Sequence, residues 1–317
     1  MHIPDTGMLD AKTCLATAAL ALGGLGIALH QARRRLPRRR IPLMGLAAAF
    51  VFAAQMVNFP VAAGTSGHLV GGVLAAVLLG PAAAVVVMTA VLIVQCLVFS
   101  DGGLLALGAN LFNMAIVNTV GGWGIYYLVH RLLPSRSGQI VATAFAAWCA
   151  TVLAAVCCAG EIAFSGVAHW AVLPAMGGIH MLIGIGEAVI TAMVLAAVAG
   201  TRPELLGDER EAPSVRIGPV VAFGLIIALG LGIFASPFAS ERPDGLERVT
   251  TDMGLSQEGK PLIAAPLPDY KLSRIPSPTI ATAAAGGIGT ILVFGLSLLL
   301  ARALSPSIPK ATAAPAT

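Results

Sequence analysis

Charged residues are few in this chain of 317 residues. They make up 11% of the sequence, whereas hydrophobic residues make up 57% and the mean hydropathy is +0.88. Soluble domains carry about 25% charged residues, so the composition excludes a soluble enzyme and predicts a protein that lies in the lipid bilayer. Alternation of apolar and polar residues is also absent, which excludes a transmembrane β-barrel.

Sequence motifs for nucleotide binding are missing as well. No G-x-x-x-x-G-K-[ST] sequence occurs, so the chain has no phosphate loop and cannot use ATP by itself. The glycine clusters at 23–26 and 286–289 follow no strand, which excludes dinucleotide-binding loops. The cysteines are odd in number, show no C-x-x-C spacing and are interpreted as packing residues: Cys14, Cys96, Cys149, Cys157 and Cys158.

Long apolar runs occupy most of the sequence. A helix needs about 20 residues to cross a hydrocarbon layer of ~30 Å, and its backbone groups pair internally. We therefore predict an all-α polytopic membrane protein with nine spans near 13–30, 41–58, 68–79, 82–99, 104–130, 139–160, 169–199, 218–236 and 279–302. The third span is short, because Gly80-Pro81 interrupts one apolar block. Glu187 is the one acidic residue that this division places deep in a span.

The distribution of arginines predicts the orientation. Six arginines follow the first span, at positions 33–35 and 38–40. Positive residues favour the cytoplasmic side, so we expect the N-terminus outside and the C-terminus inside, in the plasma (inner) membrane. A nucleic-acid or lipid-signalling patch is the alternative, and we expect no nucleic-acid partner. Few positive residues precede the first span, so we expect no cleaved signal peptide.

Composition also divides the chain into units. We predict a metal-binding transmembrane unit at 1–200, a cytoplasmic linker at 201–217 and a two-helix unit at 218–303 with an outer loop at 237–278. The tail at 304–317 is expected to be disordered. Small residues on the second span form either a docking face for another subunit or a tight contact within the chain: Gly45, Ala49 and Ala53.

The first two residues form a possible chelator. The Met1 amine, the His2 backbone nitrogen and His2 Nδ1 can hold one ion in fused five- and six-membered rings. His68 would complete a planar set of four nitrogens, which suits Ni(II) or Cu(II), with Co(II) weaker. The irregular segment NFPVAAGTSGHLVGG could form a cavity around His68, into which MHIPD folds as a plug.

Several polar residues within the apolar spans could support this site. Glu187 follows His180 by seven residues, so both lie on one helix face. Glu187 could orient a ligand histidine or form a structural hydrogen bond to a neighbouring helix. The other candidates for supporting the metal ligands are Asn58, Ser66, Gln95, Asn110, Asn113 and His180. Alternatively, Ser66 and His180 could form the nucleophile and base of an intramembrane serine protease.

Four segments resemble a known family, the substrate-binding membrane subunits of energy-coupling-factor nickel and cobalt importers. They are MHIPD, NFPVAAGTSGHLVGG, VQCLVFSDGGLLALGANLFNMAIV and HMLIGIGEAVIT, which together extend over nearly all of residues 1–200. The resemblance implies seven membrane helices and a metal site at Met1, His2 and His68. MHIP is similar to the nickel-type members. The family usually has glycine directly after MHIPD, whereas Thr6 precedes Gly7 here.

The C-terminal part resembles the small auxiliary subunit of the same importers, through PDGLE at 243–247 and PLPDY at 266–270. The resemblance implies that the two subunits are fused and that the outer loop lies near the metal entrance. It also implies partners, namely a transmembrane coupling subunit and ATPase subunits. We expect no enzyme activity and no organic cofactor, with Ni(II) or Co(II) as the transported substrate.

Overall fold

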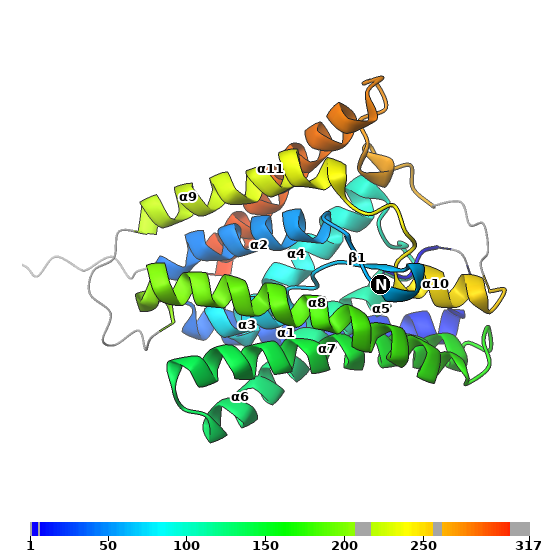
Figure 1. Ribbon diagram of the computed structural model, residues 1–317, viewed down its shortest axis with the longest axis horizontal. Helices are drawn as coiled ribbons and strands as arrows, with labels where there is room; N and C mark the ends of the chain where they lie inside the picture. Colours follow the sequence, from blue (N-terminus) through cyan, green and yellow to red (C-terminus); the bar gives the residue numbers. More distant parts are fainter. Residues whose placement is uncertain (1, 6, 207–216, 256–261, 305–317) are drawn as a thin grey trace, which may run out of the picture.

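The computed structural model describes residues 2–5, 7–206, 217–255 and 262–304. Met1, Thr6, most of the predicted linker and all of the predicted tail except Leu304 lie outside the described residues. The described part is mostly helical, and its long helices run roughly side by side along the longest axis of the molecule (Figure 1). This confirms the predicted all-α membrane class.

Helices occur at all nine predicted spans. The first unit contains α1 (Ala11–Arg35), α2 (Ile41–Gln55), α3 (Gly72–Leu79), α4 (Pro81–Phe99), α7 (Arg136–Phe164) and α8 (Val172–Thr201). Between α4 and α7, α5 (Leu107–Asn110) continues through the π-helical η3 (Leu111–Gly121) into α6 (Gly122–Leu132). The C-terminal unit contains α9 (Ile217–Gly230), the π-helical η5 (Leu231–Ala235), α10 (Gly245–Asp252) and α11 (Pro278–Leu304).

Short elements connect these helices. Two strands, β1 (Phe59–Pro60) and β2 (Ser66–Gly67), pair antiparallel between α2 and α3. The 3-10 turns are η1 (Arg38–Arg40), η2 (Ala62–Gly64), η4 (Pro203–Leu205), η6 (Ser236–Phe238) and η7 (Pro268–Tyr270). The third span was predicted from residue 68, but α3 begins only at Gly72, so His68 lies in the non-helical connection.

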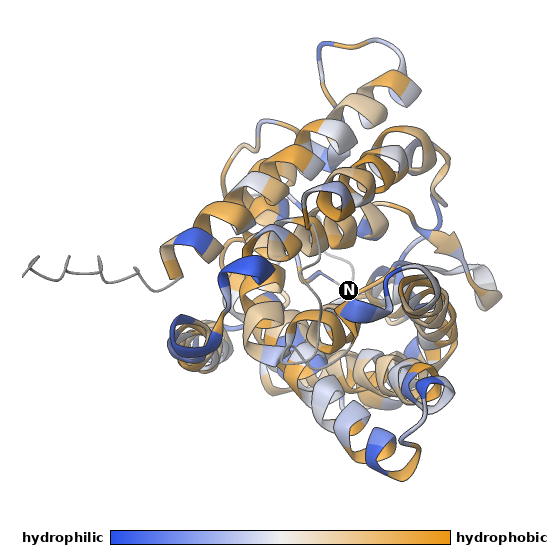
Figure 2. Cartoon of the chain, turned by 90° about the vertical axis from the view of Figure 1, so that its left-hand side faces the viewer, coloured by the Kyte–Doolittle hydropathy of each residue, from blue (hydrophilic) through white to orange (hydrophobic). Residues whose placement is uncertain are grey.

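Six helical segments within the described residues are long and apolar enough to cross a membrane. They are Ala11–Arg35, Pro81–Phe99, Arg136–Phe164, Val172–Thr201, Ile217–Phe238 and Pro278–Leu304. Figure 2 shows that most of the length of the helices carries the hydrophobic colour. Large side chains such as Leu22, Met193 and Phe223 are exposed, which fits a surface surrounded by lipid rather than water.

In the part of the chain that the structure describes, two acidic side chains, rather than one, are buried between the helices. Glu187 on α8 was predicted, and its exposed fraction is 0%. Glu161 was not, because the predicted span ended at residue 160, whereas α7 continues to Phe164. The exposed fraction of Glu161 is 7%.

The small residues of α2 face the C-terminal unit of the same chain. Gly45 lies against Phe294 of α11, and Ala49 and Ala53 are fully buried. The Ser297 hydroxyl of α11 also donates to the Met44 carbonyl, at 3.2 Å. The prediction that this face docks another subunit is therefore wrong, because α11 already covers it and the alternative of packing within the chain holds.

Replacing Gly45 with leucine should loosen the contact between α2 and α11. A Cβ atom at this position would lie 3.1 Å from the Phe294 ring and 3.2 Å from the Phe294 carbonyl oxygen, and overpacking of this kind costs about 1–3 kcal/mol. Thermal unfolding in detergent measures the loss. Gly23→Leu is the matched control, since nothing lies within 4 Å of its added Cβ; equal stability of the two variants would contradict this packing.

Candidate metal-binding site

The N-terminal segment folds back into the helix bundle beside α5. The side chain of Ile3 is fully buried. Asn110 binds both backbone groups of Ile3: the Ile3 N–H donates to Asn110 Oδ1 at 2.8 Å, and Asn110 Nδ2 donates to the Ile3 carbonyl at 3.0 Å. The Gly103 N–H donates to the same carbonyl at 2.8 Å. The backbone of the N-terminal segment is therefore held by hydrogen bonds on both of its polar groups at Ile3, mainly from the Asn110 side chain.

Asp5 fixes the other end of this segment. Its carboxylate accepts the backbone N–H groups of Leu104 and Leu105, at 2.8 and 2.9 Å. Gly103 permits this approach, because a Cβ atom there would lie only 2.5 Å from the Asp5 backbone nitrogen. The glycine-rich turn after α4 is thus shaped to receive the N-terminal segment.

The two predicted imidazole ligands meet. The ring centroids of His2 and His68 lie 5.6 Å apart, with the ring planes inclined at 49°. His68 follows β2, and its Nδ1 lies 3.1 Å from the Leu69 carbonyl. His2 Nε2 is buried without a hydrogen-bond partner among the described residues.

The Asp101 carboxylate binds the His2 ring. A carboxylate can only accept, so His2 Nδ1 carries a proton and donates it to Asp101 Oδ1. Burial raises the pKa of Asp101, but the nearby charge of His2 and hydrogen bonds from His2 and Tyr270 outweigh it and lower this pKa to about 2. Asp101 is therefore a carboxylate at neutral pH, and it orients the His2 ring.

Tyr270 connects Asp101 to the C-terminal unit. Its hydroxyl donates to Asp101 Oδ2 at 2.5 Å, and its ring stacks on Phe99 with centroids 4.7 Å apart. Asp269 and Tyr270 both adopt the left-handed backbone region, with φ values of 53° and 55°, which is unfavourable for residues other than glycine. This turn brings the tyrosine under the end of α4.

Glu187 and two glutamines hold the connection that carries His68. Glu187 Oε2 accepts the Val70 N–H at 2.6 Å, and Oε1 accepts the Gly71 N–H at 2.9 Å. Gln55 Nε2 donates to the Val70 carbonyl at 2.8 Å, and Gln95 Nε2 donates to Gln55 Oε1 at 2.7 Å. Glu187 thus acts on the backbone beside His68, rather than on an imidazole.

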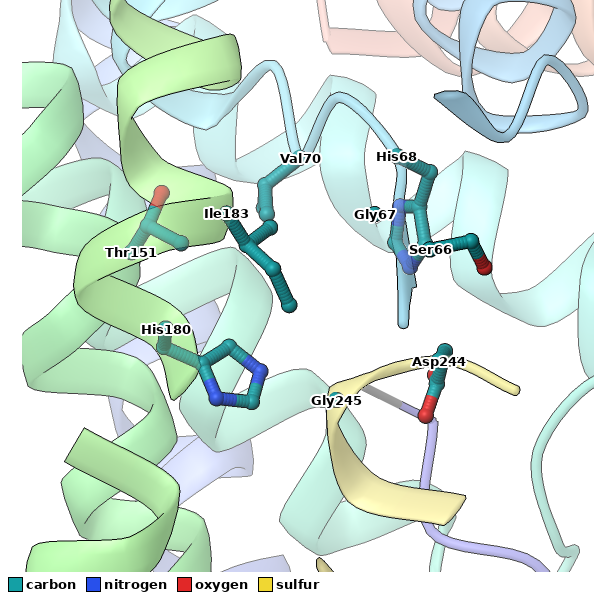
Figure 3. Close-up of a pocket in the computed structure, with 9 residues that line it drawn as sticks. All are labelled: Ser66, Gly67, His68, Val70, Thr151, His180, Ile183, Asp244 and Gly245. Carbon is teal, nitrogen blue, oxygen red and sulfur yellow. The ribbon is translucent and has the colours of Figure 1, made fainter. Parts of the chain in front are cut away.

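A small pocket lies between this connection, α8 and the start of α10. Figure 3 shows His68, His180 and Asp244 on different sides of it. Gly245 is required at its position, since an added Cβ would lie 2.5 Å from the His180 ring. Asp244 caps α10 through the N–H groups of Leu246 and Glu247. The predicted outer loop therefore contains a helix whose first turn lines the pocket.

Ser66 and His180 line the same pocket but do not bind each other. The Ser66 hydroxyl donates to the Arg242 carbonyl at 2.7 Å, and its N–H donates to the Pro243 carbonyl at 2.8 Å. His180 Nδ1 lies 2.8 Å from the Met176 carbonyl. Among the described residues no hydrogen bond joins the two side chains, so the geometry gives no support to the protease alternative.

Three predicted residues remain: Met1, Asn58 and Asn113. Met1 lies outside the described residues. The part described contains no group of three or more His, Cys, Asp or Glu residues that could hold a metal. Asn58 contributes its carbonyl to the Ser240 N–H at 2.9 Å. Asn113 binds Glu161 instead of the histidines. Asp101, Asp244 and Tyr270 are not among the residues predicted from the sequence, although each lies in a segment that resembles the family.

Comparisons with known proteins cover both units. Residues 2–205 match the family described as cobalt uptake substrate-specific transmembrane region, and residues 218–306 match the PDGLE domain. A putative fused nickel transport protein from Archaeoglobus fulgidus is 38% identical, covering 95% of this chain and 98% of its own length. A fused nickel transport protein from Rhodobacter capsulatus is 32% identical, covering 85% and 88%.

A cobalt transport protein from Sorangium cellulosum and a crystal structure extend the comparison. The former is 36% identical, covering 65% of this chain and 94% of its own length. The structure, described as a truncated transition metal transporter, has a TM-score of 0.57 and 33% identity, covering 63% of this chain and 99% of that one. The named relatives are transport proteins, not enzymes.

Replacing Asn110 with alanine should release the N-terminal segment, because it removes both side-chain hydrogen bonds to Ile3. Hydrogen exchange at the N-terminal peptide should then accelerate by roughly 10-fold or more, since each lost bond is worth about 1 kcal/mol. Gln139→Ala, which removes a bond to Tyr126 instead, is the control. Unchanged exchange in the Asn110 variant would mean that other contacts hold the segment.

Proposed function

The chain belongs to the cobalt uptake substrate-specific transmembrane family, and on that premise we propose that it captures Ni(II), with Co(II) as the alternative ion, for import. The observation that carries this proposal is the contact between the folded-back N-terminal segment and the connection before α3, where the His2 and His68 rings lie 5.6 Å apart. Imidazole and amine nitrogens are suitable donors for divalent nickel and cobalt.

The proposed ligands are the Met1 amine, the His2 backbone nitrogen, His2 Nδ1 and His68. Only Nδ1 can close a six-membered ring with the backbone nitrogen of its own residue, so this atom is assigned to the ion rather than Nε2. In the structure Nδ1 binds Asp101. The ion therefore has to displace Asp101 from Nδ1, and two protons have to leave to solvent, one from Nδ1 and one from the His2 backbone nitrogen, because both nitrogens bind a metal only when deprotonated. The displaced carboxylate stays nearby as a negative charge.

Nickel is favoured over cobalt by the fused organisation of the chain. The Archaeoglobus and Rhodobacter relatives, which match over most of both units, are fused nickel transport proteins by name. The sequence MHIP supports the same choice. Planar geometry enforced around four nitrogens would select Ni(II).

The C-terminal unit is proposed to complete the outer side of the site. Pro243 and Asp244 contact the connection that carries His68, and Tyr270 holds Asp101. Carboxylates at a cleft raise the local concentration of cations, so Asp101 and Asp244 would attract the incoming ion. This assignment agrees with units at 1–200 and 218–303 joined by a cytoplasmic linker.

Transport itself requires partners. The sequence has no phosphate loop, so a separate transmembrane coupling subunit and ATPase subunits are proposed to drive release to the inside. The arginines after α1 support the proposal that the N-terminus, and with it the site, lies on the outer side of the plasma (inner) membrane. Because α11 covers the small residues of α2, the coupling subunit has to dock on a different face.

Extending the chain before Met1 should abolish tight metal binding, because the extension converts the free amine into an amide. His68→Ala should weaken binding by more than the roughly 10- to 100-fold typical of residues that only support a ligand. Calorimetry on the untagged protein with Ni(II) and Co(II) measures both effects. His169→Ala, at an exposed site, serves as the control. Tight binding by the extended protein would refute the chelate.

Replacing Tyr270 with phenylalanine should weaken Ni(II) binding by up to about 10-fold, because the negative charge of Asp101 would no longer be held beside the ion. The variant keeps the ring stacked on Phe99 but removes the hydrogen bond that holds Asp101. Tyr127→Phe, on an exposed side of α6, is the matched control. An affinity equal to that of the unmodified protein would exclude the tyrosine hydroxyl from the site.

A further inference from the structure

Glu161 and Asn113 form a polar pair inside the bundle that the metal site does not use. Glu161 lies on α7 and Asn113 on η3, and their exposed fractions are 7% and 1%. Asn113 Nδ2 donates to Glu161 Oε2 at 2.8 Å. The pair therefore bridges two membrane-embedded elements.

Each partner keeps one buried oxygen without a hydrogen bond. Glu161 Oε1 and Asn113 Oδ1 are both unpaired among the described residues. If Glu161 were ionised, both atoms could only accept, and neither would find a donor. Two unsatisfied acceptors and a charge in hydrocarbon surroundings would be strongly unfavourable.

The described surroundings of Glu161 supply no positive charge. Within the described residues no ion pair involves it. The titratable side chains that face it are thiols, Cys157 and Cys158 on α7 and Cys14 on α1, and Asp10 lies at the start of α1. Nothing in this set compensates an ionised carboxylate.

Glu187 provides a contrast within the same molecule. It is also buried, but each of its oxygens accepts a backbone N–H, from Val70 and from Gly71. Its acceptors are therefore satisfied without a proton. Glu161 differs because one proton would supply the donor that its pair lacks.

We propose that Glu161 is an intramembrane proton-binding site. The carboxylate takes one proton from water on Oε1 and becomes a neutral acid, so that the O–H donates to Asn113 Oδ1 while Asn113 Nδ2 donates to Oε2. The two side chains then form a closed acid–amide pair in which both unpaired oxygens are satisfied.

The bound proton stabilises the contact between η3 and α7, beside the residues that bind the N-terminal segment. Asn113 lies three residues after Asn110, which holds both backbone groups of Ile3. On the other side, the Ser165 hydroxyl donates to the Glu161 carbonyl at 2.8 Å and lies 3.5 Å from Asp10 Oδ1, at the start of α1. Loss of the proton removes the hydrogen bond from Oε1 to Asn113 Oδ1, leaves only the bond from Asn113 Nδ2, and loosens η3 against α7. The proton is thus a ligand of the protein distinct from the transported metal ion.

Infrared spectroscopy of the full chain at neutral pH tests the proton directly. The unmodified protein should show the C=O stretch of a protonated carboxyl group, and Glu161→Gln should lose it. Glu241→Gln, which removes an exposed acid, should leave the band unchanged. A spectrum in which Glu161→Gln loses no protonated-carboxyl band would overturn the proposal.

A second variant covers the case in which Glu161→Gln does not fold. Asn113→Leu removes the acceptor and should shift the same band to higher frequency, because a carboxyl group without a hydrogen-bond partner has a stiffer C=O bond. An unshifted band would show that the proton is not shared with Asn113, and would equally overturn the proposal.

Hydrogen exchange tests the consequence for the N-terminal segment. In the unmodified protein, exchange at the peptide containing Ile3 should rise with pH more steeply than base catalysis alone explains, as Glu161 loses its proton. In Glu161→Gln, whose amide can replace both hydrogen bonds of the neutral acid, the additional rise should be absent. The same additional rise in both proteins would contradict a link between this proton and the segment.

Discussion

The pair of hydrogen bonds between Asn110 and the Ile3 backbone is the interaction on which the rest of the site depends. One carboxamide satisfies the N–H and the carbonyl of a fully buried residue, so the chain end enters the bundle without leaving unpaired backbone groups. The position of His2 follows from this contact, and His2 in turn meets His68. A chain end is ordinarily mobile, and here polar groups and a buried side chain offset the entropy of ordering it.

The surroundings of the two histidines are built from both units of the chain. The first unit supplies the imidazoles and Asp101, while the second supplies the backbone that binds Ser66, the start of α10 and the ring of Tyr270. The long contact between α2 and α11 holds the two units together within the bundle. Covalent fusion keeps the second unit at a high effective concentration, which suits a site whose wall is shared.

Much of the fold could be predicted from the sequence, because apolar runs and Gly80-Pro81 carry the signal for helices and their breaks. The proximity of His2 and His68 followed from coordination chemistry. The burial of Glu161 was not predicted, because the ends of helices are uncertain by a few residues in the sequence. The small residues of α2 indicated close packing but could not identify the partner helix. Asp101 and Tyr270 lie 169 positions apart, and a contact over such a separation leaves no local pattern.

The left-handed turn at Asp269 and Tyr270 introduces backbone strain beside the contact between Tyr270 and Asp101. Two adjacent residues in this region cost about 1–2 kcal/mol each, and the stacking on Phe99 together with the bond to Asp101 outweighs that cost while the ring stays in place. Both compensating contacts belong to the first unit, so the backbone conformation of this C-terminal segment depends on Phe99 and Asp101.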